Sequence, residues 1–198
     1  DVERIQNTVP RAELMDVVLA ICGGALRLYL EQKGELPEAS LNALLPRHVQ
    51  AEFEQGLAGH QVQFLSCDIG TDQKNPLSRL ESVVAGRRVA SEEAKVMQTD
   101  LSELGDALPS SMMSMAARSI ATRFGPAKRF RENHNTIINL IPGPEEKLHL
   151  CGAKLLGFSG MPIIMDHLAL NHTVTPYAGK LSIAAVCDRK IMPDPEHY

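Results

Sequence analysis

Hydrophobic residues recur at steps of three and four in the first third of the chain, which places them on one face of a helix: Leu14, Val17, Val18, Ile21, Ala25 and Leu28. The pattern predicts a helix from Glu13 to about Gln32, with Gly34 suited to a left-handed end. The pair Gly23-Gly24 lies inside it, at a cost on the order of 1 kcal/mol per glycine relative to alanine. We therefore expect this helix to pack closely against a sheet.

Two strands and two more helices are expected in the middle of the chain. The apolar run Leu41–Leu45 predicts a short buried strand that Pro46 ends. Apolar side chains fall on both faces of Val62–Ile69, which predicts a strand covered on both sides. The spacing after Pro76 predicts a second helix, and that after Pro109 a third.

The last third of the chain changes to a strand-and-turn pattern. Three segments are rich in β-branched and aliphatic residues and are broken by Gly and Pro: Thr136–Ile141, Lys147–Gly157 and Leu168–Asp188. Residues 177–180 suit a hairpin turn. Helices and strands do not alternate regularly, so we expect the α/β (α+β) class, a mixed sheet with helices packed on it, rather than a doubly wound fold.

Composition narrows the class of protein further. The chain has 198 residues, 44% of them hydrophobic and 22% charged, which is typical of one globular domain. The net charge of −4 gives no general attraction for nucleic acid. Four cysteines without a CxxC pair and no apolar run near the ~20 residues of a membrane span favour a protein of the reducing cytoplasm.

The common catalytic signatures are missing from this sequence. It contains no GxGxxG, GxxxxGK[ST], GxSxG or HExxH, and none of its seven histidines has metal-ligand spacing, so we expect no metal site and ordinary surface or core histidines. Met112–Met115 suits either core packing or a lipid channel. The basic residues between Arg118 and Arg131 suit either a solvated face or an anionic partner.

One polar residue interrupts the apolar run at Thr136–Ile141. Period-two geometry places Asn139 on the same face as Ile137 and Ile141. Its amide either points into a substrate channel or is satisfied by neighbouring backbone, and both interpretations stay open. Pro142-Gly143-Pro144 predicts a rigid turn directly after the strand.

Several segments together resemble one bacterial family. Residues 16–30, DVVLAICGGALRLYL, are similar to the NDVVLAxxxGALRRYL helix of the wax ester synthase/diacylglycerol acyltransferases. The resemblance continues through the following segments: Leu36-Pro37, Asp68 to Asp72, Asn75-Pro76-Leu77, Asn139 to Pro144, Ala169-Leu170-Asn171, Tyr177 to Leu181 and Met192-Pro193-Asp194. Met15 stands where the family motif has Asn.

This resemblance implies a lobe of a larger protein. The family resembles chloramphenicol acetyltransferase, with two lobes and an active site in a tunnel between them, and residues 1–198 resemble the C-terminal lobe, truncated at both ends. The family's HHxxxDG motif, whose second His is the general base, belongs to the N-terminal lobe and does not occur here. We therefore expect no catalytic residue in this chain and a partner in its own N-terminal lobe.

The implied function is acyl transfer. The family moves a fatty acyl group from acyl-coenzyme A, a substrate rather than a cofactor, to a long-chain alcohol or diacylglycerol. Substrate contacts are expected from five positions: Asp16, Asn139, Pro142, Gly143 and Asn171. For Asp16 the alternative is a purely structural role, in which a carboxylate in the first turn of the helix is stabilised by ~0.3–1 kcal/mol through the helix dipole.

A non-catalytic alternative stays open. A degenerate paralogue would bind lipid or a protein without catalysis, and an HHxxxDG motif upstream of Asp1 separates the two hypotheses. Half of a two-lobed protein should also expose an apolar face, and such faces are uncommon on monomers. A homo-oligomer and contact with a membrane or lipid-inclusion surface are therefore further expected partners to test.

Overall fold

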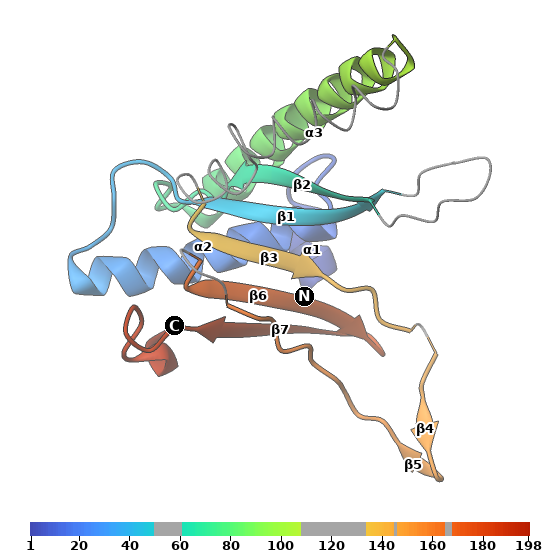
Figure 1. The fold of residues 1–198 in the computed structure, drawn as a ribbon. Coiled ribbons are helices and arrows are strands. Elements are labelled where there is room, and N and C mark those ends of the chain that lie inside the picture. Colours follow the sequence, from blue (N-terminus) through green and yellow to red (C-terminus); the bar gives the residue numbers. More distant parts are fainter. Residues whose placement is uncertain (50–60, 108–133, 145, 165–167) are drawn as a thin grey trace.

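The computed structural model describes residues 1–49, 61–107, 134–144, 146–164 and 168–198 (Figure 1). Its elements are α1 (Val2–Gln6), α2 (Leu14–Lys33), β1 (Asn42–Val49), β2 (Gln61–Asp68), α3 (Pro76–Ala107), β3 (Thr136–Leu140), β4 (His149–Leu150), β5 (Ala153–Lys154), β6 (Leu170–Tyr177), β7 (Lys180–Cys187) and the 3-10 helix η1 (Pro195–His197). The predictions for the third helix, for Met112–Met115 and for the basic residues 118–131 lie outside the described residues.

Five strands form one mixed sheet in the order β2-β1-β3-β6-β7. The three central strands, β1, β3 and β6, run parallel to one another, and β2 and β7 pair antiparallel at the two ends of this order. A separate two-stranded sheet, β4-β5, projects away from this body (Figure 1). The prediction of a mixed sheet with helices packed on it is confirmed.

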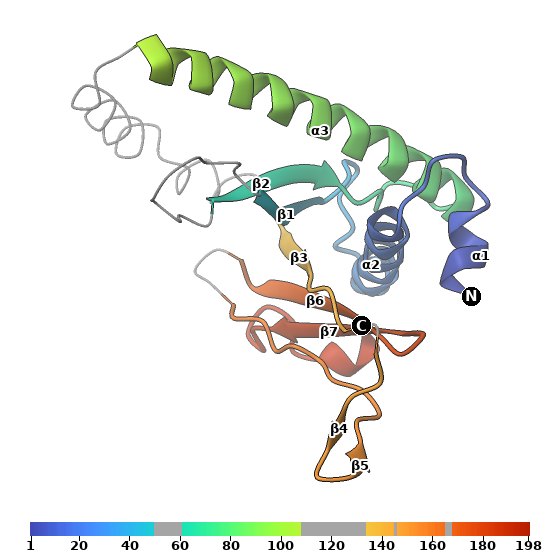
Figure 2. The ribbon, with the colours of Figure 1, turned by 90° about the vertical axis from the view of Figure 1, so that its right-hand side faces the viewer.

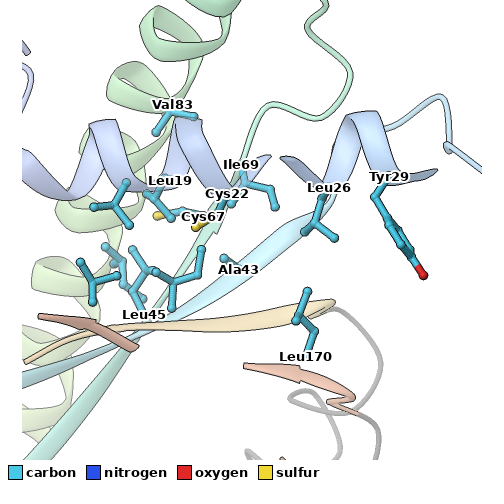
Figure 3. Packing of buried hydrophobic residues seen from close by; sticks show 14 of the residues in the cluster. Leu19, Cys22, Leu26, Tyr29, Ala43, Leu45, Cys67, Ile69, Val83 and Leu170 are labelled. Atoms are coloured by element: carbon cyan, nitrogen blue, oxygen red, sulfur yellow. The ribbon is translucent and has the colours of Figure 1, made fainter. Parts of the chain in front are cut away.

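Helices α1 and α2 lie on one side of the sheet, and α3 runs along β2 and α2 (Figure 2). The core between α2 and the sheet is built from Leu19, Cys22 and Leu26 on the helix and from strand residues such as Ala43 and Leu45 (Figure 3). These side chains are at most 5% exposed, so their removal from water is the main stabilising contribution of this layer.

The predicted ends of α2 are confirmed within one residue. The backbone N–H of Glu13 donates to Asp16 Oδ2 at 2.7 Å, which satisfies a donor that helical hydrogen bonding leaves free at an N-terminus. At the other end Gly34 has φ of 69°, a left-handed conformation that glycine adopts without steric cost. The chain then leaves the helix towards β1.

Two details of the predicted strands are wrong. Pro46 does not end β1, which continues to Val49, because β3 pairs with β1 only at Ala43 and Leu44. Beyond Leu44 that side of β1 has no ladder partner among the described strands, so a residue without an N–H is tolerated. Strand β2 is buried on one face only, since Phe64 on its other face is 46% exposed.

The rigid turn predicted after β3 is also absent. Residues 141–144 form neither a turn nor a bend, and they stay beside β6, where Ile141 N donates to Val174 O at 2.9 Å. Residues that precede proline favour extended backbone, so the two prolines here carry the chain onward instead of reversing it. The predicted hairpin at Tyr177–Lys180 is confirmed, with Ala178 and Gly179 at φ of 47° and 78°.

Candidate functional site

One face of the sheet packs against α2. The opposite face, called here the far face, carries Ile137, Asn139 and Asn171. Strand register pairs Ile137 with Asn171 and Asn139 with Thr173, and paired residues in a sheet point to the same side. Ile137 packs with Leu44 and Leu168 in a cluster separate from the α2 core, so this side is the far face. Two predicted substrate contacts, Asn139 and Asn171, therefore lie together on neighbouring strands.

Asn139 is half-buried near the end of β3. Among the described residues its amide forms no hydrogen bond, whereas Asn42 and Asn135 at the other end of the sheet bond to neighbouring groups. A half-buried amide that keeps both donor and acceptor capacity can bind a polar group of a ligand. The interpretation in which neighbouring described backbone satisfies Asn139 finds no support in these contacts.

Asn171 is 7% exposed and holds a loop against the far face. Its Nδ2 donates to Ile163 O at 2.8 Å. Its Oδ1 has no partner within the described part of the chain, and neither has the hydroxyl of Thr175, four residues further along β6 on the same face. Buried polar atoms without a partner are costly, so these two atoms are candidates to bind polar groups of a ligand on an otherwise largely apolar face.

Pro142 is exposed and Gly143 half-buried where the chain leaves β3. A side chain at Gly143 would overlap the carbonyl oxygen of Pro176 and approach the Phe158 ring to 3.3 Å. Glycine is thus required by the close approach of this segment to the end of β6. The predicted contacts Asn139, Pro142 and Gly143 form one continuous stretch beside the far face.

Asp16 lies on the other side of the sheet, fully buried at the start of α2. It forms a two-pronged ion pair with Arg87 of α3, in which Arg87 Nη2 donates to Asp16 Oδ2 at 3.1 Å and Nε donates to Oδ1. The hydrogen bond to Asp16 raises the pKa of Arg87. The neighbouring Met15 packs against the α2 core. These contacts explain the burial of Asp16 by a structural role, in which it joins the start of α2 to α3.

Sequence reasoning missed a buried polar chain centred on His172. This side chain, fully buried on β6, has Nδ1 at 3.0 Å from Thr136 Oγ1 and at 3.3 Å from Ile137 O. Its Nε2 lies 2.7 Å from the hydroxyl of Tyr198, whose ring packs edge-on against Tyr29. His172 lies on the same face of β6 as Leu170 and Val174, which both belong to the α2 core. Two apolar neighbours at a spacing of two residues were the available signal for a core histidine.

We expect the stability of the fold to fall below neutral pH because of His172. Burial lowers the pKa of His172 from 6.5 to about 4, so between these values the unfolded chain binds more protons and stability decreases as the pH falls. Urea unfolding midpoints between pH 7.5 and 4.5 should decrease steadily, and His172→Asn should flatten that slope. An equal slope in both proteins would contradict a neutral buried imidazole.

A salt bridge and a hydrogen bond join the C-terminal segment to the end of α2. Asp194 Oδ1 accepts from Tyr29 Oη at 2.7 Å, and Oδ2 lies 2.8 Å from Lys33 Nζ. These two hydrogen bonds, to Lys33 first, lower the pKa of Asp194 to about 2. They explain why the Met192-Pro193-Asp194 segment has a fixed place beside α2.

A pocket of about 320 Å³ lies at the opposite end of the sheet from Asn139. Apolar side chains dominate its wall: Leu26, Leu30, Leu41, Leu170, Ile191 and Met192. It contains none of the five predicted contacts. Within the described ranges no group of three acidic, His or Cys side chains could hold a metal ion, and no helix has the length and apolarity to cross a bilayer.

Comparisons with known proteins agree with one another. The family model "WS/DGAT C-terminal domain" matches residues 58–198. A putative diacylglycerol O-acyltransferase of Mycobacterium tuberculosis is 32% identical over 92% of this chain, and the O-acyltransferase WSD of Acinetobacter baylyi is 29% identical over 98% of it. The chain spans only 36% and 41%, respectively, of the length of these relatives.

A solved structure shows the same fold. The wax ester synthase/diacylglycerol acyltransferase from Marinobacter aquaeolei VT8 superposes with a TM-score of 0.67 at 25% identity, over 97% of this chain and 41% of its own. The resemblance seen in the helix and strand motifs is thereby confirmed. The family model, the relatives and the fold together show that this chain belongs to the wax ester synthase/diacylglycerol acyltransferase family, in which it corresponds to the C-terminal domain.

Proposed function

We propose that this chain works as the C-terminal lobe of an O-acyltransferase, which moves a fatty acyl group from acyl-coenzyme A to a long-chain alcohol or to diacylglycerol. The observation that carries the proposal is the match of the fold, over 97% of the chain, to a protein named for wax ester and diacylglycerol acyl transfer. The relatives from Mycobacterium and Acinetobacter are named as O-acyltransferases too.

The chemistry requires a base that this chain does not provide. A histidine of the HHxxxDG motif, in the N-terminal lobe, would take the proton of the acceptor hydroxyl, and the oxygen would attack the thioester carbonyl. The tetrahedral intermediate then collapses into the ester, and the coenzyme A sulfur leaves and takes up the proton. Neither HHxxxDG nor any pair of adjacent histidines occurs in the 198 residues.

The far face would supply part of the substrate wall. Asn139 offers an amide there with no partner among the described residues, and Asn171 adds a buried acceptor on the next strand. An amide without a partner can donate a hydrogen bond to an oxygen of the bound substrate and so help to hold the substrate in the tunnel. Pro142 fixes its own φ and Gly143 lies close against Pro176 O of β6, so the backbone that follows Asn139 is held in place.

The test is an assay of the intact polypeptide and of the 198-residue chain alone. With palmitoyl-coenzyme A and hexadecanol or a diacylglycerol, the intact polypeptide should release free thiol and form ester. The chain alone should show no turnover, since a general base contributes ~10²–10⁴-fold and the opposite wall is missing. Equal turnover by the chain alone would refute the assignment as a lobe, and an inactive intact protein would refute acyl transfer.

The same assay tests Asn139 in the intact polypeptide. Asn139→Ala should lower kcat/KM about five- to tenfold, as expected for the loss of one hydrogen bond worth about 1 kcal/mol. Asn135→Ala is the matched control, because Asn135 precedes the same strand at its other end and bonds to the backbone of Asn42. Identical kinetics of the two variants would remove Asn139 from the substrate wall.

A further inference from the structure

Residues 158–164, called here the strap, lie along the far face of β6. The Phe158 ring packs edge-on against the Tyr177 ring at the end of β6, with 5.5 Å between the ring centroids. Near the beginning of β6, Asn171 Nδ2 donates to Ile163 O at 2.8 Å. The strap therefore runs along the strand in the opposite direction, as the return of the chain from β5 to the start of β6 shows in Figure 2.

The middle of the strap fits closely against this face. A Cβ at Gly160 would lie 2.8 Å from Thr173 Cγ2 and 3.6 Å from Thr173 Cβ and Ile141 Cδ1, so this close approach requires glycine. Exposure alternates along the strap: Phe158, Gly160 and Pro162 are half-buried, whereas Ser159, Met161 and Ile163 are exposed. One side of the strap thus faces the sheet and the other side faces away from it.

Few bonds hold the strap in place. None of its backbone groups bonds to the backbone of another described residue, and the contact of Ile163 O with Asn171 is its one hydrogen bond to a side chain in the described part of the chain. Met161 is 87% exposed and Ile163 81%, so these two side chains add little packing. A segment with few buried contacts and few hydrogen bonds opens at a low free energy.

The closed strap also covers polar atoms that have no partner. Thr175 lies between Thr173 and Tyr177 on the far face, where Gly160 and Phe158 pack. Its hydroxyl and Asn171 Oδ1 are buried and form no hydrogen bond with any described residue. A polar atom buried in this way loses its hydration without compensation. Displacement of the strap would expose both atoms to polar partners, which lowers the free energy that opening requires.

We propose that the strap opens to admit diacylglycerol as the acceptor, and that Asn171 and Thr175 then bind an ester group of this substrate. This inference rests on the proposed function, in which the far face is part of the substrate wall. Asn139 lies opposite Thr173 in the sheet register, and Gly160 packs on Thr173. The strap therefore borders the part of the wall that contains the Asn139 amide.

The chemistry of the two acceptors differs in what the opened face can bind. A diacylglycerol carries ester groups next to the hydroxyl that reacts, and each ester has a carbonyl oxygen that accepts hydrogen bonds. The Thr175 hydroxyl can donate to such an oxygen, and so can Asn171 Nδ2 once Ile163 O has moved away. A long-chain alcohol has a single unbranched chain and no ester group. The opening of the strap should therefore matter for diacylglycerol and not for the alcohol.

Opening can be measured at a cysteine placed beneath the strap. Thr173 is 2% exposed under the strap, and the next residue, Val174, is fully buried on the α2 side of β6. In the intact polypeptide, N-ethylmaleimide should alkylate Thr173→Cys roughly tenfold or more faster than Val174→Cys, because only the strap has to move. Asn171→Ala, which removes the hydrogen bond to the strap, should increase the first rate and leave the second unchanged. Peptide mass spectrometry resolves each site, and unreacted Cys22 and Cys67, both buried, verify the fold.

A disulfide between the strap and β6 tests what the opening does. In Gly160→Cys with Thr173→Cys the Cβ atoms would lie 3.6 Å apart, which suits a disulfide, and cysteine lacks the Cγ2 atom of Thr173 that would crowd position 160. The oxidised intact polypeptide should lose most of its turnover with diacylglycerol and keep its turnover with hexadecanol. Dithiothreitol should restore the lost activity. The two single variants, oxidised in the same way, are the matched controls and should not change their preference between the acceptors.

Four outcomes would count against the proposal or the function on which it rests. Equal alkylation rates at positions 173 and 174 would overturn the opening of the strap. Unchanged diacylglycerol turnover in the oxidised double variant would overturn its role in acceptor entry, and equal losses with both acceptors would overturn the selection of diacylglycerol. An unmodified intact polypeptide that is inactive with both acceptors, but in which Thr173→Cys reacts rapidly, would reject the proposed function and keep the movement of the strap.

Discussion

Asp16→Ala is expected to destabilise the fold by about 3–5 kcal/mol, the range found when one partner of a buried ion pair is removed. Asp16 is fully buried, and Arg87 donates two hydrogen bonds to it. Alanine would leave the guanidinium, whose side chain is 13% exposed, with Glu13 as its remaining carboxylate in the described structure. Alanine would also remove the acceptor for the N–H of Glu13 at the start of α2.

Urea unfolding at pH 7 measures this loss, and a double-mutant cycle separates its causes. Arg87→Met should cost a similar amount, because it leaves a buried carboxylate without its cation. The pair Asp16→Ala with Arg87→Met should cost clearly less than the sum of the two single changes, as for residues in direct contact. Additive effects would show that the two side chains do not interact in solution.

This cycle also distinguishes packing from substrate contact at Asp16. If Asp16 acts only through its contact with Arg87, a substitution at Asp16 should lower the activity of the intact polypeptide only as far as it lowers the fraction of folded protein. Asp16→Asn keeps an oxygen for the N–H of Glu13 and should therefore be milder than alanine in the unfolding experiment. If Asp16→Asn abolished turnover at unchanged stability, Asp16 would belong to the substrate site despite its place beside α3.

The periodic parts of the fold could be predicted from the sequence. Helix α2 was predictable because its apolar face, its glycine end and its length all indicate the same element. The hairpin between β6 and β7 was predictable from local turn chemistry. Pro46 was misjudged because its tolerance depends on where β3 stops pairing, which is a property of the sheet and not of the local sequence.

Tertiary contacts decided the rest of the candidate site. Period-two alternation placed Asn139 on the correct strand face, but the position of Asn171 beside it depends on the pairing of β3 with β6. The role of Asp16 depended on Arg87, which lies 71 residues away in sequence. Residues 147–157 were predicted as strand and turn, and nothing in their sequence alone says that Leu150 and Leu156 remain exposed.

Gly23→Ala is the second change with a large expected effect. A methyl group at Gly23 would overlap the carbonyl oxygen of Ile69, directly after β2, and would approach the Ile69 side chain to 3.3 Å. The backbone of Ile69 is itself held by a 2.9–3.0 Å network, in which Ile69 N donates to Leu41 O at 3.0 Å and Gly70 N donates to Ser40 Oγ at 2.9 Å. Neither α2 nor this loop can therefore move without breaking other contacts.

The expected loss for Gly23→Ala is about 2 kcal/mol or more, because overpacking costs typically 1–3 kcal/mol while the gain in helix propensity is at most about 1 kcal/mol. At Gly24 a methyl group would meet only the end of the Arg79 side chain, at 2.5 Å from Nη1, so Gly24→Ala should cost less. Gly86 on α3 has no described neighbour within 4 Å of such a group, and Gly86→Ala should be neutral or stabilising. Unfolding midpoints that rank Gly23→Ala lowest and Gly86→Ala highest would establish close packing of α2 on the sheet. Equal midpoints for Gly23→Ala and Gly86→Ala would contradict it, because the two glycines have the same helical propensity and differ in what surrounds them.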